Sequence, residues 1–144
     1  MKSTFILSLI LLVICSCSER KDAQIFTTPE EPILSLMKAA NAQDSVAIIN
    51  TLTSTTKESV VSKLRETGGF KALFDSTKGL HQEVKILKIE TDKEFPNSAK
   101  VFVNETFVRD TLRRTMDSVY FYAFKEENGW KLSSLSPRYD RRRP

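Results

Sequence analysis

Apolar residues recur at helical spacing early in the chain, between positions 33 and 40. They stand at i, i+3, i+4 and i+7, which places them on one face of a helix: Ile33, Leu36, Met37 and Ala40. Ahead of them Thr28 and Glu31 have the spacing of a capping box, and the prolines of TTPEEP suit a first helical turn. The pattern predicts a helix that begins in this segment and runs to about Ala42.

Two more helices are predicted in the first half of the chain. Asp44 is a suitable N-cap for a short helix over SVAIINTL, residues 45–52. Thr55 opens a second capping-box spacing and predicts a longer helix that ends at Gly68. An apolar turn or short helix follows over residues 70–74.

After His81 the periodicity changes from helical to extended. Four segments rich in valine, isoleucine and aromatic residues follow one another: 83–91, 99–110, 117–126 and 130–136. The turn-like segments FPNS, TLRRT and ENG separate them. Four sequential strands with short connections indicate an antiparallel meander. Helices followed by strands indicate an α+β domain, with the N-terminal helices packed on one face of a curved sheet.

The two central strands are apolar on both faces. Val101 and Val103 alternate with Phe102 in one strand, and Phe121 alternates with Tyr122 in the next. A layer of helices can bury only one of the two faces. The other face must meet a partner subunit, a ligand or a bend of the sheet over itself.

We expect this second face to enclose a cleft, with Tyr120, Tyr122 and Trp130 among the residues that bind a ligand. A tyrosine ring buries apolar area while its hydroxyl keeps a polar partner, which suits a cleft and a subunit interface alike. The cleft interpretation predicts a small apolar ligand, a peptide or a partner protein. The interface interpretation predicts a homodimer.

The first 20 residues have the layout of a secretory signal, with a positive start at Lys2 and an apolar core over residues 5–14. As a helix that core would reach about 15 Å, whereas a membrane-spanning helix must cross roughly 30 Å of hydrocarbon. The core is therefore too short to remain as a membrane span.

Two cysteines close this segment, in the sequence ICSC. Ile14 stands three residues before Cys17 and the small Ser16 stands immediately before it, a frame that resembles a bacterial lipobox. Cys15 is preceded by the bulky Ile14 and fits the frame less well. We therefore expect cleavage before Cys17 and lipidation of Cys17, which leaves no free thiol. An ordinary cleaved signal with two incidental cysteines is the alternative.

These features divide the chain into a signal peptide (1–16), a lipidated N-terminus and tether (17–28), one α+β domain (29–137) and a basic tail (138–144). We expect a protein of the cell envelope, anchored through its N-terminal lipid at the outer membrane. The tail segment SPRYDRRRP is interpreted as solvated, and contact with anionic lipid headgroups is the alternative.

The composition is that of an ordinary globular domain, with 40% apolar and 28% charged residues. The formal net charge of +4 is too small to indicate nucleic acid as a partner. With a single histidine and no cysteine pair left after cleavage, we expect no metal site. No glycine-rich phosphate loop or nucleophile elbow appears, and we expect no cofactor.

From about Pro29 to Pro137 the order of elements is similar to that of the nuclear-transport-factor-2-like (cystatin-like) fold. AANAQDSVAIINTL fits the helix break and second helix of that family, and ENGWKLSSLSP fits its last hairpin. The chain looks like the small lumazine-binding-like lipoprotein domains of unknown function that are common in Bacteroidetes. The resemblance implies a cleft-bearing binding or accessory domain and carries over no catalytic residue.

Some domains of this fold are isomerases or cyclases with a carboxylate base in an apolar cleft, so a small cleft enzyme is the alternative function. The candidate residues, besides the tyrosines, are Asp110, Asp117, Glu105 and His81. We expect both aspartates to be solvated and His81 to lie at the surface. Glu105 interrupts an apolar strand, and we expect it at the rim of the sheet in an ion pair with Arg109.

Overall fold

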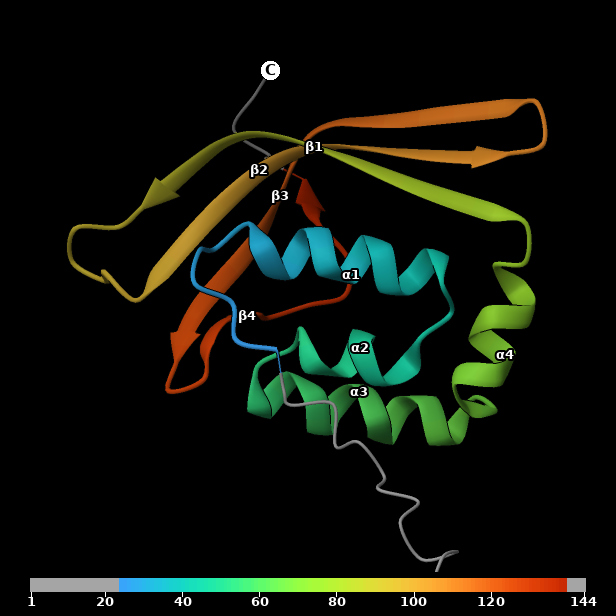
Figure 1. Ribbon diagram of the computed structural model, residues 1–144, viewed down its shortest axis with the longest axis horizontal. Helices are drawn as coiled ribbons and strands as arrows, with labels where there is room; N and C mark the ends of the chain where they lie inside the picture. The colour runs from blue at the N-terminus through green and yellow to red at the C-terminus, as the bar shows by residue number, and fades with distance from the viewer. Residues whose placement is uncertain (1–23, 140–144) are drawn as a thin grey trace, which may run out of the picture.

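A computed structural model describes residues 24–139, and its helices precede its strands along the chain (Figure 1). The helices are α1 (Glu31–Asn41), α2 (Ser45–Asn50), α3 (Ser54–Glu66) and α4 (Gly69–Ser76). The strands are β1 (Leu80–Thr91), β2 (Ser98–Arg109), β3 (Leu112–Glu126), β4 (Gly129–Leu132) and β5 (Arg138–Tyr139). They form an antiparallel sheet in the order β1-β2-β3-β4, with β5 paired to β3. The predicted α+β class is confirmed.

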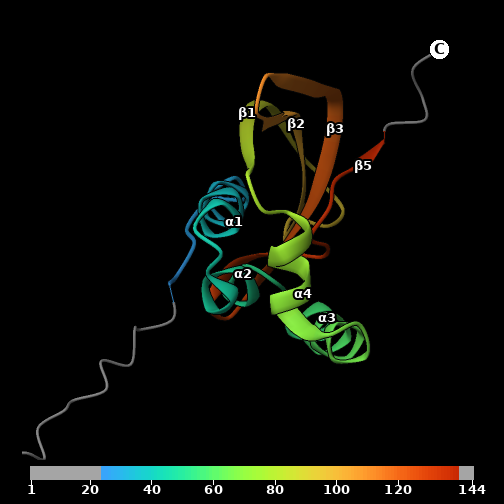
Figure 2. The same cartoon turned by 90° about the vertical axis from the view of Figure 1, so that its right-hand side faces the viewer.

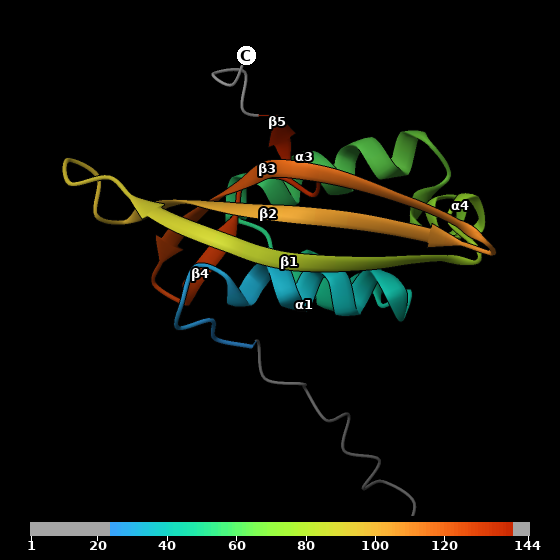
Figure 3. The same ribbon diagram turned by 90° about the horizontal axis from the view of Figure 1, so that it is seen from above.

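The three long strands β1, β2 and β3 lie over the helices (Figure 3). Register shifts mark a bulge between Ile86 and Lys88 on β1 and another in the β2–β3 ladder between Val103 and Glu105. Bulges bend a sheet and increase its twist. The face toward the helices is called the concave face below, and the opposite one the outer face. In the end-on view the helices lie to one side of the strands (Figure 2).

Side chains cap two of the helices. Asp44 Oδ1 accepts a hydrogen bond of 3.0 Å from the N–H of Ala47, so the predicted cap of α2 is confirmed. Helix α3 is capped by Thr53 and not by Thr55, because Thr53 Oγ1 accepts from the N–H of Thr56 at 3.3 Å. Thr53 is the last extended residue before α3, and the helix therefore begins earlier than predicted.

The β2–β3 connection is tighter than predicted. Strand β3 begins at Leu112, so most of the segment TLRRT is strand and its assignment as a turn is wrong. A short turn suffices because Asp110 has a φ of 53°, a left-handed conformation that aspartate tolerates. Leu112 is 76% exposed at the hairpin tip, and the absence of a buried face there explains why apolar periodicity missed the start of β3.

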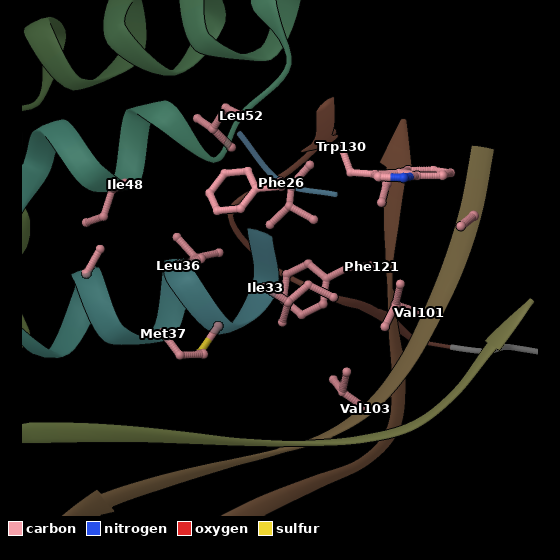
Figure 4. Close-up of a cluster of buried hydrophobic side chains, with 14 of the residues drawn as sticks. Phe26, Ile33, Leu36, Met37, Ile48, Leu52, Val101, Val103, Phe121 and Trp130 are labelled. Atoms are coloured by element: carbon pink, nitrogen blue, oxygen red, sulfur yellow. The ribbon is translucent and has the colours of Figure 1, made fainter. Parts of the chain in front are cut away.

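The core fills the space between the helices and the concave face (Figure 4). Seven of its labelled members come from α1, α2, β2 and β3: Ile33, Leu36, Met37, Ile48, Val101, Val103 and Phe121. Ile33, Leu36 and Met37 of the predicted stripe of α1 are buried, whereas Ala40 is only partly buried, and the methionine is a core residue as expected.

The folded unit begins before the predicted boundary at residue 29. Phe26, assigned to the tether, is 1% exposed in the core, and its carbonyl accepts a 2.9 Å hydrogen bond from the N–H of Trp130. Gly129 makes this approach possible, because a Cβ there would lie 2.3 Å from the Phe26 carbonyl oxygen. The segment SERKDAQIFT, which contains Phe26, resembles a tether because it mixes charges of both signs with little periodicity.

The other boundary also moves. Arg138 and Tyr139, assigned to the basic tail, form β5 and pair with Tyr120 and Val119. This edge of β3 is free because β4 pairs only with the last residues of β3. The rest of the tail, residues 140–144, lies outside the described residues.

Candidate functional site

A cavity of about 440 Å³ lies between α1, α4 and the concave face of the sheet. Apolar side chains from these elements, from α2 and from the segment before β5 dominate its lining: Leu36, Met37, Ala40, Ile48, Leu73, Phe74, Leu80, Phe107, Met116, Leu135 and Pro137. Its volume and apolar walls are typical of a small-molecule site.

Glu105 of β2 is the only carboxyl group among the residues that line this cavity. Only 3% of Glu105 is exposed, and its Oε2 atom is buried without a hydrogen-bond partner in the part of the chain that the structure describes. Val84 and Met116 flank it on the neighbouring strands. A buried polar atom without a partner costs free energy, and such atoms are rare in folded proteins.

Burial changes the acidity of this carboxyl group. Desolvation raises the pKa of Glu105 from an ordinary value of 4.5 to about 7. Near neutral pH the cavity therefore holds both the carboxylic acid and the carboxylate. Either form can bind a ligand, the acid as a hydrogen-bond donor and the carboxylate as an acceptor.

The predicted ion pair between Glu105 and Arg109 is wrong. Arg109 Nη2 instead donates to the carbonyl oxygen of Ser76 at 3.2 Å. Strand β2 keeps its alternation through the bulge, because the extra residue is on β3, and Glu105 therefore points inward with Val103 and Phe107. That periodicity was present in the sequence and could have placed Glu105 on the buried face.

Two polar side chains of the cavity wall are engaged by backbone. Asn41 Nδ2 donates to the Gln82 carbonyl and its Oδ1 accepts from the Gln82 N–H, both at 2.7 Å. Thr77 Oγ1 donates to the carbonyl of Leu73 at 3.0 Å. The first pair of bonds ties α1 to the edge strand β1 and holds the cavity wall in place.

The cavity adjoins a second hollow, of about 730 Å³, at the β2–β3 hairpin. Both are bordered by Leu80, Phe107, Met116 and Tyr139. The second hollow adds Leu112 and the three arginines 109, 113 and 114. The mouth of the cavity is therefore basic, whereas its interior is apolar around one acid.

Tyr120 and Tyr122 lie together on the outer face, with ring centroids 5.2 Å apart. The Lys100 Nζ atom lies 5.4 and 5.5 Å from these centroids, within the range of cation–π contact. Neither tyrosine lines the 440 Å³ cavity. Tyr122 and Phe124 instead border an open hollow of about 1060 Å³ beside the β1–β2 connection.

Trp130 is not brought together with the two tyrosines. Its neighbour Leu132 pairs with Ala123, and this register places Trp130 on the concave face. Trp130 is 8% exposed and belongs to the core, as Figure 4 shows. Of the three ligand-binding residues predicted from the sequence, the structure thus groups only the tyrosines.

The remaining candidates are at the surface. His81, Asp110 and Asp117 are exposed, and His81 Nε2 lies 3.9 Å from a carboxylate oxygen of Glu83. Within residues 24–139, no three or more histidine, cysteine, aspartate or glutamate side chains are placed to hold a metal ion. Glu105 is the one acidic candidate that the fold carries into the cavity.

None of the helices between residues 24 and 139 is long and apolar enough to cross a membrane. The predicted signal peptide and the lipidation site Cys17 fall in residues 1–23, outside the described residues.

No protein-family model matches the chain, and no curated protein matches it. Solved structures do match it. One is a domain assigned as a calcium/calmodulin-dependent protein kinase type II association domain, from Thiobacillus denitrificans. It is 13% identical, the match covers 76% of this chain and 92% of that one, and the TM-score is 0.57.

Two proteins of Nostoc punctiforme, each of unknown function and with a cystatin-like fold, are also similar. The first is 16% identical with a TM-score of 0.56, and the match covers 83% of this chain and 98% of that one. The second is 12% identical with a TM-score of 0.53, covering 71% and 68%. These likenesses define the fold as cystatin-like, as the sequence predicted.

Proposed function

We propose that this chain is a lipid-anchored cell-envelope protein whose cystatin-like domain binds a small, mainly apolar ligand in the cavity around Glu105. One observation carries the proposal, an apolar cavity of about 440 Å³ that contains a single buried acid. The cavity is large enough for a small molecule, and the acid supplies one directional contact inside it.

The cost of burying Glu105 supports a role in binding. A pKa shift from 4.5 to about 7 corresponds to about 3 kcal/mol of lost stability when the group is ionised. Within the described residues no cation or hydrogen-bond donor offsets this cost at Oε2. A ligand with a polar atom at this point would supply the missing partner.

Filling the cavity tests the proposal. Ala40 lines the cavity on α1, and Ala40→Phe would occupy part of its volume. Leu34→Phe is the matched control, because Leu34 is 47% exposed on the same helix and does not line the cavity. We expect the neutral fluorescent probe N-phenyl-1-naphthylamine to bind the full chain and the control but not Ala40→Phe. Equal binding by both folded variants would contradict the cavity as the site.

The anchor is proposed at Cys17, on the strength of the residues that precede it. Cys17→Ser should give a protein without lipid that is released from membranes, since the thioether cannot form. Cys15→Ser is the control and should leave anchoring unchanged. A mature N-terminus that retains Cys15, detected by mass spectrometry, would overturn this assignment.

A cleft enzyme of the isomerase type is the second candidate, favoured by a carboxyl group whose pKa of about 7 suits a general base. Such an enzyme also needs a donor for the oxyanion. Tyr139 borders the cavity, but it is 64% exposed and its hydroxyl lies 3.2 Å from the sulfur of Met116. Exchange of α-protons of a bound ketone for solvent deuterium, lost in Glu105→Gln, would favour the enzyme over binding alone.

A structural homodimer through the outer face is the third candidate, favoured by the exposed aromatic edge at Phe124 beside Tyr122. Sedimentation of the full chain separates this role from a monomeric binding protein. A dimer that Tyr122→Glu converts to a folded monomer would support the interface.

A further inference from the structure

We propose that the ligand of this cleft is an amphipathic organic acid, with its apolar body in the 440 Å³ cavity and its carboxylate bound by Arg109 and Arg114 at the mouth. This inference rests on the proposed function, because it names the ligand class of the same site. It is carried by the placement of charge along the concave face.

The register of β2 and β3 places the two arginines on the concave face. Arg114 pairs directly with Phe107, whose side chain lines the cavity, and paired residues share a face. Arg109 is two residues beyond Phe107 on the same strand and therefore lies on the same face. Both guanidinium groups thus follow Phe107 outward from Glu105 toward the hairpin tip.

These arginines have no acidic partner. Arg114 makes no ion pair within the described residues, and Arg109 binds only the neutral carbonyl of Ser76. Arg113 borders the same hollow but differs in having an acidic partner, because its Nη2 atom pairs with Glu83 at 2.8 Å. Among residues 24–139, no acidic side chain lines the mouth. A carboxylate matches the fork of donors that a guanidinium presents.

The charges also set the direction in which an acid enters. Glu105 lies in the interior, and Arg109 is four residues further along β2, a distance of about 13 Å. In its ionised form Glu105 repels a second carboxylate, so the acid group stays at the arginines. The apolar body then contacts Phe107, Met116 and Leu36 inside. A hydroxyl at the far end of that body would give Glu105 the hydrogen-bond partner it lacks, and probes without this hydroxyl test the arginines alone. An ammonium head group would meet the arginines and is disfavoured at the same place.

Three probes with one alkyl chain and different head groups test this inference on the full chain by calorimetric titration at pH 8. They are dodecanoate, dodecan-1-ol and dodecylammonium, each below its micelle-forming concentration. Dodecanoate should bind most tightly. Its affinity should exceed that of dodecan-1-ol by about tenfold, which corresponds to one charge-assisted hydrogen bond.

Substitutions of the arginines assign this preference to the mouth. Arg114→Gln and Arg109→Gln should each lower the affinity for dodecanoate several-fold and leave the affinity for dodecan-1-ol unchanged. Arg65→Gln is the matched control, because it removes the same charge from an exposed position of α3 that lines neither hollow, and it should leave the preference for dodecanoate intact.

The outcomes separate this inference from the proposed function. If all three probes bind equally, or if Arg65→Gln weakens dodecanoate binding as much as Arg114→Gln does, the acid-specific mouth is wrong while the apolar cleft stands. If dodecanoate binds and Ala40→Phe does not weaken it, the acid binds elsewhere and the inference fails. If neither these probes nor N-phenyl-1-naphthylamine binds, the cleft itself is wrong and the inference falls with it.

Discussion

The concave and outer faces of β2 and β3 carry similar apolar side chains but bury them in different ways. On the concave face Val101, Val103 and Phe121 are 0% exposed beneath the helices. On the outer face Tyr122 is half-buried, and its ring packs between neighbouring aromatic residues with the Arg138 guanidinium 5.4 Å from its centroid. One face is closed by secondary structure, and the other is covered only by side chains.

The two faces also differ in how they treat a charged side chain. On the outer face a charged group next to the aromatic rings stays in contact with water, as Lys100 does. On the concave face Glu105 is only 3% exposed, beside a cavity that α1 and α4 also line, and its carboxyl group loses hydration. The same polar interruption of an apolar strand is therefore a surface feature on one face and a candidate binding group on the other.

The largest expected effect is in the core. Phe121→Ala should destabilise the domain by about 3 to 5 kcal/mol, because it removes a fully buried ring and leaves a cavity. Phe124→Ala, on the outer face, is the matched control and should cost about 1 kcal/mol, since Phe124 is already 39% exposed. Urea denaturation of both variants measures the contrast, and equal midpoints would show that the two faces are not differently buried.

The next effect is a pH dependence of stability from Glu105. The folded state holds its proton more tightly than the unfolded state, because folding raises the pKa from 4.5 to about 7. Stability from this group is complete below pH 4.5 and falls by up to about 3 kcal/mol as the pH rises through 7. Glu105→Gln cannot ionise, so it should be more stable than the parent at pH 8 and similar at pH 4.5.

Glu94→Gln is the control for this comparison, since Glu94 is exposed. Denaturation curves at pH 4.5 and pH 8 should place this control with the parent chain at both values. A Glu105→Gln variant that is less stable than the parent at pH 8 would show that the carboxylate has a stabilising partner.

A smaller effect is expected on the outer face. Lys100→Met keeps an apolar stem but removes the charge over Tyr120 and Tyr122, and it should cost about 0.5 to 1 kcal/mol. Lys85→Met, at an exposed position of β1, should change the unfolding free energy less. Thermal unfolding measures both, and identical shifts would mean that the cation–π contacts contribute nothing.

The smallest effect is expected at Asp117, which is exposed on β3. Asp117→Asn should change the free energy of unfolding by less than about 0.5 kcal/mol. A loss as large as that of Phe124→Ala in urea denaturation would mean that Asp117 has a structural partner.

Regular periodicity predicted the fold well where an element has one buried face, as α1, β2 and β3 do. The stripe of α1 and the cap at Asp44 were visible in this way. Features that depend on a single contact were not, such as Phe26, whose place in the core depends on the close approach of Gly129. The residues next to Phe26 and Gly129 in the sequence do not indicate that the two meet in the fold.

In the candidate site, too, some features follow from the periodicity of the sequence and others depend on the three-dimensional structure. Alternation along β2 is sufficient to direct Glu105 inward, yet the choice of a rim position followed from its charge alone. The cavity could not be predicted, because it depends on the bulges that curve the sheet and on the position of α4. The tyrosines were expected to line a cleft because alternation shows that a strand has two apolar faces but not which one encloses space.

The most direct test of the account is the ionisation of Glu105 itself. The ¹³C chemical shift of its side-chain carboxyl, assigned by comparison with Glu105→Gln and followed from pH 3 to pH 9 in the folded chain, reports its pKa. The account predicts a midpoint near 7, the consequence of an acid sealed in an apolar cavity. A midpoint near 4.5 would contradict it, since Glu105 would then be hydrated or paired and the cavity would not be the enclosed site described above.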